Sequence, residues 1–125
     1  MKYLLLCCHE EKTLASMSES ECVAVMEETM AYCEALKQSG HLNAVEQLEP
    51  VQRAMTVRVR SGKLLVTDGP FAETKEQIGG FFLIDAKDLN EAIQVASKFP
   101  SARFGSLEVR PVKELPGSDR LVAGL

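Results

Sequence analysis

The 125-residue sequence predicts an α+β domain with a ferredoxin-like β-α-β-β-α-β order and one added β-hairpin. Three observations predict this class. First, two segments combine a helix-capping signal with apolar residues at helical spacing, which predicts two helices. Second, each predicted helix is flanked by short apolar or alternating segments, which predict strands. Third, a tight turn joins two alternating segments that lie between the two predicted helices. The length suits one domain, which we assign to residues 1–113, with residues 114–125 as a C-terminal tail.

The first part of the chain predicts one buried strand and one long helix. Residues 3–8 are a short apolar run, typical of a strand covered on both faces, and residues 9–17 are predicted to be a polar connection. Ser18 and Glu21 form a capping-box pattern, which predicts a helix over residues 19–39. One stripe of this helix is apolar and is expected to face the core: Cys22, Met26, Met30, Cys33 and Leu36.

The middle of the chain predicts a weak strand followed by a hairpin. Gly40 suits the left-handed position that ends a helix, and a weak strand is expected over residues 41–48. Residues 54–60 alternate between apolar and polar side chains, and residues 63–67 form the returning strand after the Ser61-Gly62 turn.

The last third repeats the strand-helix-strand order. A strand is predicted over residues 79–85, and the pair Asp88 and Glu91 is a second capping signal. Pro100 ends the helix, and a final strand is predicted over residues 106–112. The helix is expected to turn these residues to the core: Leu89, Ala92, Ile93, Ala96 and Phe99.

Both helices are expected to cover the same face of the sheet. The opposite face would then expose Leu, Val and Phe side chains, which a lone domain tolerates poorly. The sequence therefore predicts a homodimer in which a second subunit covers this face.

Charge and hydropathy exclude several classes of partner. The chain has 14 Lys and Arg against 18 Asp and Glu, a net charge of −4, and its basic residues form no cluster. Binding to nucleic acid or to an anionic membrane surface is therefore not expected. The apolar run near the N-terminus is too short for a signal peptide and no run is long enough to span a membrane, so a cytoplasmic protein is expected.

The four cysteines are predicted to be reduced and mostly buried. Cys22 and Cys33 are about 16 Å apart along one helix, which is too far for a disulfide. Cys7 and His9 share one side of a strand, but zinc sites use three or four protein ligands and no further ligand follows at a suitable spacing. No metal and no cofactor are expected, and His9 is interpreted as an ordinary residue at a strand end.

Residues 67–81 contain the most specific motif. Asp68-Gly69-Pro70-Phe71 is followed by a Lys-Glu pair, two glycines and an aromatic strand, and Glu108-Val109-Arg110-Pro111-Val112 lies near the end. In these features the sequence resembles the YCII-related family, specifically its branch named for the Asp-Gly-Pro-Phe (DGPF) motif. The resemblance covers residues 1–113 and implies a ferredoxin-like fold that dimerises sheet to sheet as an α+β barrel.

The resemblance implies two different functions. Some relatives in the wider family are similar to small-molecule lyases that use a histidine on the first helix with an aspartate. Thr29 and Met30 occupy the matching turn here, so that histidine is missing, and Asp68 is the counterpart of the aspartate. Genes of this branch often lie beside those of extracytoplasmic-function sigma factors, which implies a non-catalytic, partner-binding regulatory module as the alternative.

The predicted site is a cleft near Asp68 at the dimer interface, open to a small molecule. Asp68 would act as a base with His41 in place of the missing histidine, and Lys75, Arg58 and Phe71 would contact the ligand. Four of these residues also have a structural interpretation. Asp68 would cap its turn, His41 would interact with the end of the first helix, Lys75 would lie in a solvated loop, and Arg58 would lie on an exposed hairpin face.

Overall fold

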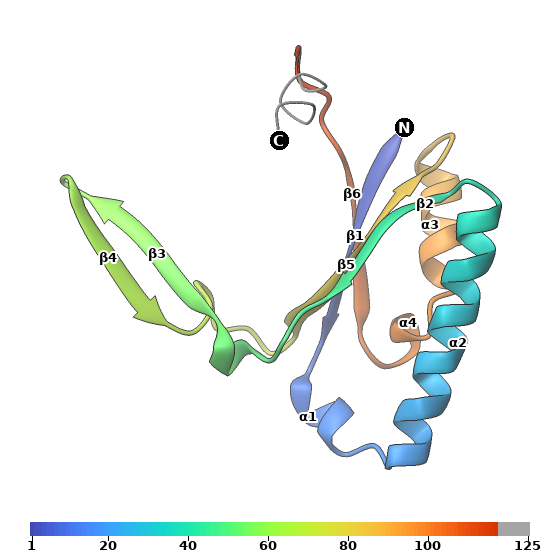
Figure 1. The fold of residues 1–125 in the computed structure, drawn as a ribbon, viewed down its shortest axis with the longest axis horizontal. Helices are drawn as coiled ribbons and strands as arrows, with labels where there is room; N and C mark the ends of the chain where they lie inside the picture. The colour runs from blue at the N-terminus through green and yellow to red at the C-terminus, as the bar shows by residue number, and fades with distance from the viewer. Residues whose placement is uncertain (118–125) are drawn as a thin grey trace.

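The computed structural model describes residues 1–117, so most of the expected tail, from residue 118 onward, lies outside the described residues. The predicted order of strands and helices is confirmed, with two short helices added (Figure 1). The elements in chain order are β1 (Lys2–His9), α1 (Glu11–Ala15), α2 (Glu19–Gln38), β2 (Leu42–Gln47), the 3-10 turn η1 (Val51–Arg53), β3 (Met55–Arg60), β4 (Lys63–Asp68), β5 (Gln77–Asp85), α3 (Leu89–Ser97), α4 (Ser101–Phe104) and β6 (Ser106–Pro111).

The fold is ferredoxin-like, as the sequence predicts. Strands β2, β5, β1 and β6 form an antiparallel sheet in that order, and β3 and β4 form a separate two-stranded sheet. Figure 1 shows α2, α3 and α4 on one side of the four-stranded sheet and the hairpin projecting on the other. No helix of residues 1–117 is long and apolar enough to cross a membrane.

The core lies between the four-stranded sheet and the helices. Phe99, just after α3, is fully buried, stacks on Phe82 with ring centres 3.9 Å apart, and meets the Tyr32 ring edge-on at 4.7 Å. The Tyr32 hydroxyl donates a hydrogen bond to the Val95 carbonyl at 2.7 Å, which joins α2 to α3. The buried hydrophobic residues are Tyr3, Leu5, Leu36, Phe82, Ile84, Ala86, Ala92, Val95, Ala96 and Phe99.

Helix α2 begins and ends as predicted, but the expected core stripe is confirmed only at Cys33 and Leu36 and is wrong along the first half of the helix. The Glu21 backbone N–H donates to Ser18 Oγ at 3.1 Å, and the Ser18 backbone N–H donates to Glu21 Oε1 at 3.2 Å, which completes the capping box. Along the first half of the helix, however, Cys22, Met26 and Met30 are exposed. The side that turns inward is formed by Val25, Thr29 and Tyr32 together with the predicted Cys33 and Leu36.

Two further expectations are corrected. Part of the connection predicted over residues 9–17 forms α1, so the chain turns through a short helix directly after β1. In α3 the Asp88 cap accepts from the Glu91 backbone N–H at 2.8 Å as predicted, but Leu89 and Ile93 are about half exposed. Val95, which the predicted stripe omits, is buried in their place because α3 is covered by α2 on that side.

The cysteines are all free, as predicted, but not all are shielded. Cys22 is exposed, while Cys7, Cys8 and Cys33 are half-buried. Burial raises the pKa of the Cys7, Cys8 and Cys33 thiols, and a hydrogen bond to Ser101 opposes this at Cys7. The expectation of mostly buried thiols is therefore wrong at Cys22.

We expect the native protein to show one fast and three slow thiols toward a thiol-specific reagent at about pH 8. Thiolate is the reactive form, so a raised pKa lowers the reactive fraction of Cys7, Cys8 and Cys33, and their rates should climb as the pH rises. Cys22→Ser should remove the fast phase, and all four thiols should react in denaturant. Fewer than four in denaturant would contradict the free-cysteine assignment.

Candidate functional site

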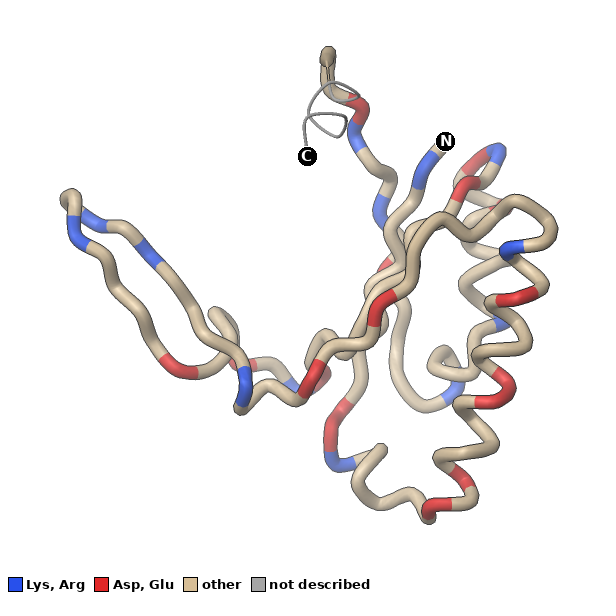
Figure 2. The backbone as a smooth tube through the Cα atoms, viewed as in Figure 1, with Lys and Arg blue, Asp and Glu red and all other residues tan. Residues whose placement is uncertain are grey.

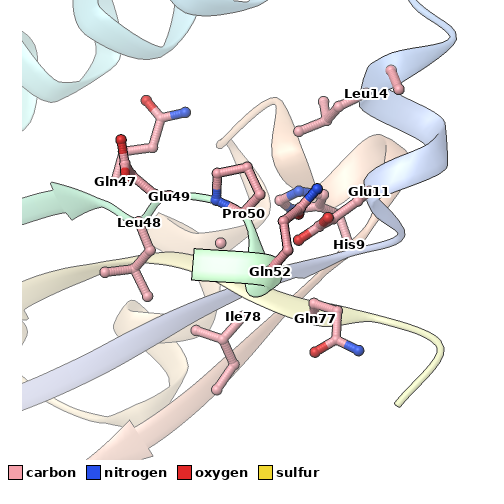
Figure 3. Close-up of a pocket in the computed structure, with 12 residues that line it drawn as sticks. His9, Glu11, Leu14, Gln47, Leu48, Glu49, Pro50, Gln52, Gln77 and Ile78 are labelled. Atoms are coloured by element: carbon pink, nitrogen blue, oxygen red, sulfur yellow. The ribbon is translucent and has the colours of Figure 1, made fainter. Parts of the chain in front are cut away.

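A pocket of about 360 Å³ opens between the end of β1, α1, the segment from β2 to η1, and the start of β5 (Figure 3). Its walls come from four separate stretches of the chain, which the fold brings together at one end of the four-stranded sheet. The lining residues are His9, Glu11, Leu14, Ala15, Gln47, Leu48, Glu49, Pro50, Gln52, Gln77, Ile78 and Gly79.

A strand pairing and a hydrogen bond between distant parts of the chain hold two sides of this pocket together. His9 ends β1 opposite Gln77, the first residue of β5. Glu11 follows at the start of α1, and its Oε1 accepts a hydrogen bond from the Val51 backbone N–H at 2.9 Å. This bond ties η1 to α1 across the pocket and uses one carboxylate oxygen of Glu11.

The His9 side chain fits closely between two glycines. A Cβ atom on Gly79 would lie 2.2 Å from Cε1 of the His9 ring, and a Cβ atom on Gly105 would lie 3.0 Å from the His9 Cβ. The imidazole therefore occupies the space that a side chain at residue 79 would need. Within residues 1–117 no hydrogen bond involves either ring nitrogen of His9, so both remain available to a molecule in the pocket.

The pocket is acidic and rich in amides. Glu11 and Glu49 supply carboxylates, the three glutamines supply amides, and neither Lys nor Arg is among its lining residues. Carboxylates accept hydrogen bonds and repel anions. The pocket therefore suits a neutral molecule with hydroxyl donors. No group of three or more potential metal ligands occurs in the described part of the chain.

The structure does not bring Asp68 and His41 together. His41 lies between α2 and β2, where Nδ1 is 2.7 Å from Ser39 Oγ and Nε2 is 3.2 Å from Glu91 Oε1. Asp68 ends β4 opposite Met55 in the projecting hairpin. The prediction that His41 reaches Asp68 is wrong within one chain, because the two residues lie beyond opposite ends of β2 (Figure 1).

Within one chain, Asp68 has neither of the environments expected for it, and the predicted cleft at a dimer interface stays a prediction. Its side chain is exposed rather than desolvated in a cleft, and among residues 1–117 its carboxylate accepts no hydrogen bond from a backbone N–H. The turn is held instead by the Gly69 backbone N–H, which donates to the Ala54 carbonyl at 2.7 Å, and by the Thr56 hydroxyl, which donates to the Gly69 carbonyl at 2.7 Å.

The three predicted ligand contacts lie on the hairpin and on the loop that follows it. Lys75 forms an ion pair with Glu10 at 3.3 Å, and its side chain is 85% exposed, as the structural interpretation expects. Arg58 lies in β3 on the hairpin, and Phe71 is 81% exposed at the start of the loop that follows β4. The Lys75–Glu10 pair places that loop beside the residues that precede the pocket helix α1.

The pocket residues His9 and Glu11 were missed as a site from the sequence. One signal could have found them: Gly79 lies inside a strand, and a glycine inside a strand often marks a close approach by another group. Here that group is the His9 ring.

Comparisons with known proteins agree with this fold. The model of the YCII-related domain matches residues 1–116. An uncharacterized protein of Rhizobium meliloti (strain 1021) is 40% identical over 114 residues, which cover 90% of this chain and 92% of that protein. A solved structure, 5-chloro-2-hydroxyhydroquinone dehydrochlorinase from Burkholderia phenoliruptrix AC1100 in complex with 2,5-dihydroxybenzoquinone, has a TM-score of 0.54 at 16% identity and covers 93% of this chain and 97% of its own. At this identity the likeness concerns the fold.

Proposed function

Because the chain belongs to the YCII-related family, we propose that it binds a small hydroxylated ring compound in the pocket beside His9 and catalyses a lyase-like proton transfer on it. The observation that carries the proposal is the placement of the His9 imidazole, which is packed against Gly79 and lines the same pocket as the Glu11 carboxylate. The name of the dehydrochlorinase with a similar fold supports the reaction class.

Different pocket residues would have different roles in this reaction. Histidine is the side chain most often used as a general acid or base. A ring nitrogen of His9 would take a proton from the bound molecule, the freed electron pair would form a new double bond, and the leaving group would depart with its own bonding pair. Glu11 and the glutamines would hold the hydroxyl groups, and Leu14, Leu48 and Ile78 would contact the ring.

We expect hydroquinone, as a neutral probe, to shift the NMR signals of the His9 ring at concentrations up to about 10 mM. The chain has only two histidines, so His41, which is bonded to Ser39 and Glu91, is an internal control whose signals should stay in place. 4-Hydroxybenzoate should bind at least about tenfold more weakly, because its carboxylate would face Glu11 and Glu49.

Two variants make this test specific. Glu11→Gln keeps an acceptor for the Val51 N–H but removes the negative charge. It should therefore reduce the difference in binding affinity between hydroquinone and 4-hydroxybenzoate. His9→Gln should lower any chloride release from 5-chloro-2-hydroxyhydroquinone by about 100-fold or more, the usual contribution of a general base. Equal shifts at His9 and His41, or none at His9, would contradict the binding site. Absence of chloride release by the wild type would contradict the lyase activity alone.

A further inference from the structure

One side of α2, distinct from the side that packs on the sheet, carries an exposed apolar patch along the first half of the helix. Val23, Met26 and Met30 are 50%, 53% and 65% exposed, and Cys22 is exposed beside them. These side chains are neighbours on the helix surface, because residues three or four apart lie next to each other there. A single exposed apolar residue is ordinary, but a contiguous patch usually marks an interaction site.

Glutamates extend this patch along the helix. Glu19 lies one turn before Val23 and Glu27 one turn after it, while Glu34 lies one turn after Met30. Apolar and acidic side chains therefore share one strip of the helix surface, about 22 Å long at the usual rise per residue. We call this set, all of whose members are exposed, the α2 ridge: Glu19, Cys22, Val23, Met26, Glu27, Met30 and Glu34.

The three glutamates of the α2 ridge have no cation of their own. In the described part of the chain no ion pair involves them, and Glu34 accepts only a 3.5 Å hydrogen bond from the Gln38 side chain. Glu28, elsewhere on the same helix, shows the contrast, since its two oxygens accept from Arg103 at 3.2 and 2.6 Å. Figure 2 shows acidic positions along α2, whose single cation is Lys37 in the last turn. The ridge charges are therefore free to meet an outside partner.

We propose that the α2 ridge docks a basic amphipathic helix of a different protein. Apolar residues of that helix would contact Val23, Met26 and Met30, and its Lys or Arg side chains would contact the glutamates. Amphipathic helices are recognised through residues at i, i+3, i+4 and i+7, and helices pack on one another through rows of residues four apart. The ridge presents the same spacing at residues 23, 26, 27 and 30. The proposal does not rest on the ligand pocket.

Charge selects this occupant over the others that an apolar patch could take. A second copy placed ridge against ridge would bring like charges together, and each chain already carries a net charge of −4. Nucleic acid and anionic lipid would be repelled for the same reason. A basic helix gains from the opposite charge, which both orients the two surfaces and speeds their encounter. The patch and its charges therefore favour one kind of partner.

The α2 ridge combines adaptable side chains with a fixed support. Methionine is unbranched and polarizable, so it fits partners of varied shape and is frequent on surfaces that bind several sequences. The helix beneath is held in place, because Leu36 on its inward side is buried and the Tyr32 hydroxyl donates to the Val95 carbonyl at 2.7 Å. Docking on the ridge therefore requires side-chain adjustment but no change of the fold.

The first test uses the wild type and two synthetic peptides of equal length. One has leucines at helical spacing and lysines at the other positions, and the second has the same leucines with glutamates. The chain has five methionines, whose methyl signals NMR can follow one by one. The lysine peptide, at up to about 1 mM, should shift the signals of Met26 and Met30 and leave those of Met1 and Met55 in place. The glutamate peptide should bind at least about tenfold more weakly.

Matched variants at exposed positions, which leave the core intact, make the test specific to the ridge. Met30→Gln should weaken binding of the lysine peptide at least about fivefold, whereas Met55→Gln, at a methionine of similar exposure on the hairpin, should change it less than about twofold. Glu27→Gln should weaken binding about threefold or more and make it less sensitive to salt, whereas Glu73→Gln in the exposed loop after β4 should do neither.

Four results would overturn the proposal. They are equal affinity for the two peptides, no binding of the lysine peptide at about 1 mM, binding without shifts at Met26 and Met30, and equal effects of Met30→Gln and Met55→Gln. The first would show that charge does not select the partner, and the others would show that the ridge is not where a basic helix binds.

Discussion

Phe99→Ala is expected to lower the free energy of unfolding by about 3–5 kcal/mol, the usual cost of removing a fully buried aromatic ring. Phe99 is fully buried and is the point at which the sheet and both long helices meet, through Phe82 on β5 and Tyr32 on α2. A domain of this size is stable by only about 5–15 kcal/mol. The variant should therefore be partly unfolded at moderate temperature, and urea unfolding followed by circular dichroism measures the loss.

Phe99→Leu is the matched control for this result. Leucine keeps most of the buried volume but loses the stacking on Phe82 and the edge contact with Tyr32. The expected cost is therefore less than about 1.5 kcal/mol, as for other swaps that conserve volume. If Phe99→Ala and Phe99→Leu cost the same, the cavity is not the source of the loss, and the packing described around Phe99 would be wrong.

The elements of this fold could be predicted because their signals are local. The Ser18–Glu21 capping box, the alternation of residues 54–60 and the Ser61-Gly62 turn each depend on neighbours within a few residues. The inward side of α2 could not be predicted in the same way. Met26 and Met30 form an apolar stripe in sequence, but the elements that α2 contacts turn Val25, Thr29 and Tyr32 inward.

The candidate site was harder to predict because it depends on long-range geometry. Asp68 belongs to a specific motif, yet the motif lies at the base of a hairpin that projects away from the sheet. His41 precedes β2 and the hairpin follows it, so the length of that strand keeps the two residues apart within one chain. The sequence alone favours an ordinary strand-end role for His9, because only the register of β1 against β5 shows that its ring lies over Gly79.

Gly105→Ala is expected to cost about 3 kcal/mol of unfolding free energy, at the upper end of the usual penalty for overpacking. An added Cβ would lie 2.3 Å from the Cys8 backbone carbonyl oxygen and 3.2 Å from the His9 Cα. Backbone cannot rotate away as a side chain can, so the end of β1 would have to separate from the start of β6, where Cys8 pairs with Ser106.

Gly79→Ala is the comparison that separates damage to the fold from damage to the site. The three atoms nearest to its added Cβ all belong to the His9 ring, which can swing aside, so the loss of stability should stay at about 1 kcal/mol. The displaced ring would leave its place in the pocket wall, and hydroquinone binding should weaken about tenfold or more. Urea unfolding of both variants, with NMR of the His9 ring for Gly79→Ala, measures the two effects. An unchanged urea midpoint for Gly105→Ala would contradict the close approach of residue 105 to β1, on which the position of His9 depends.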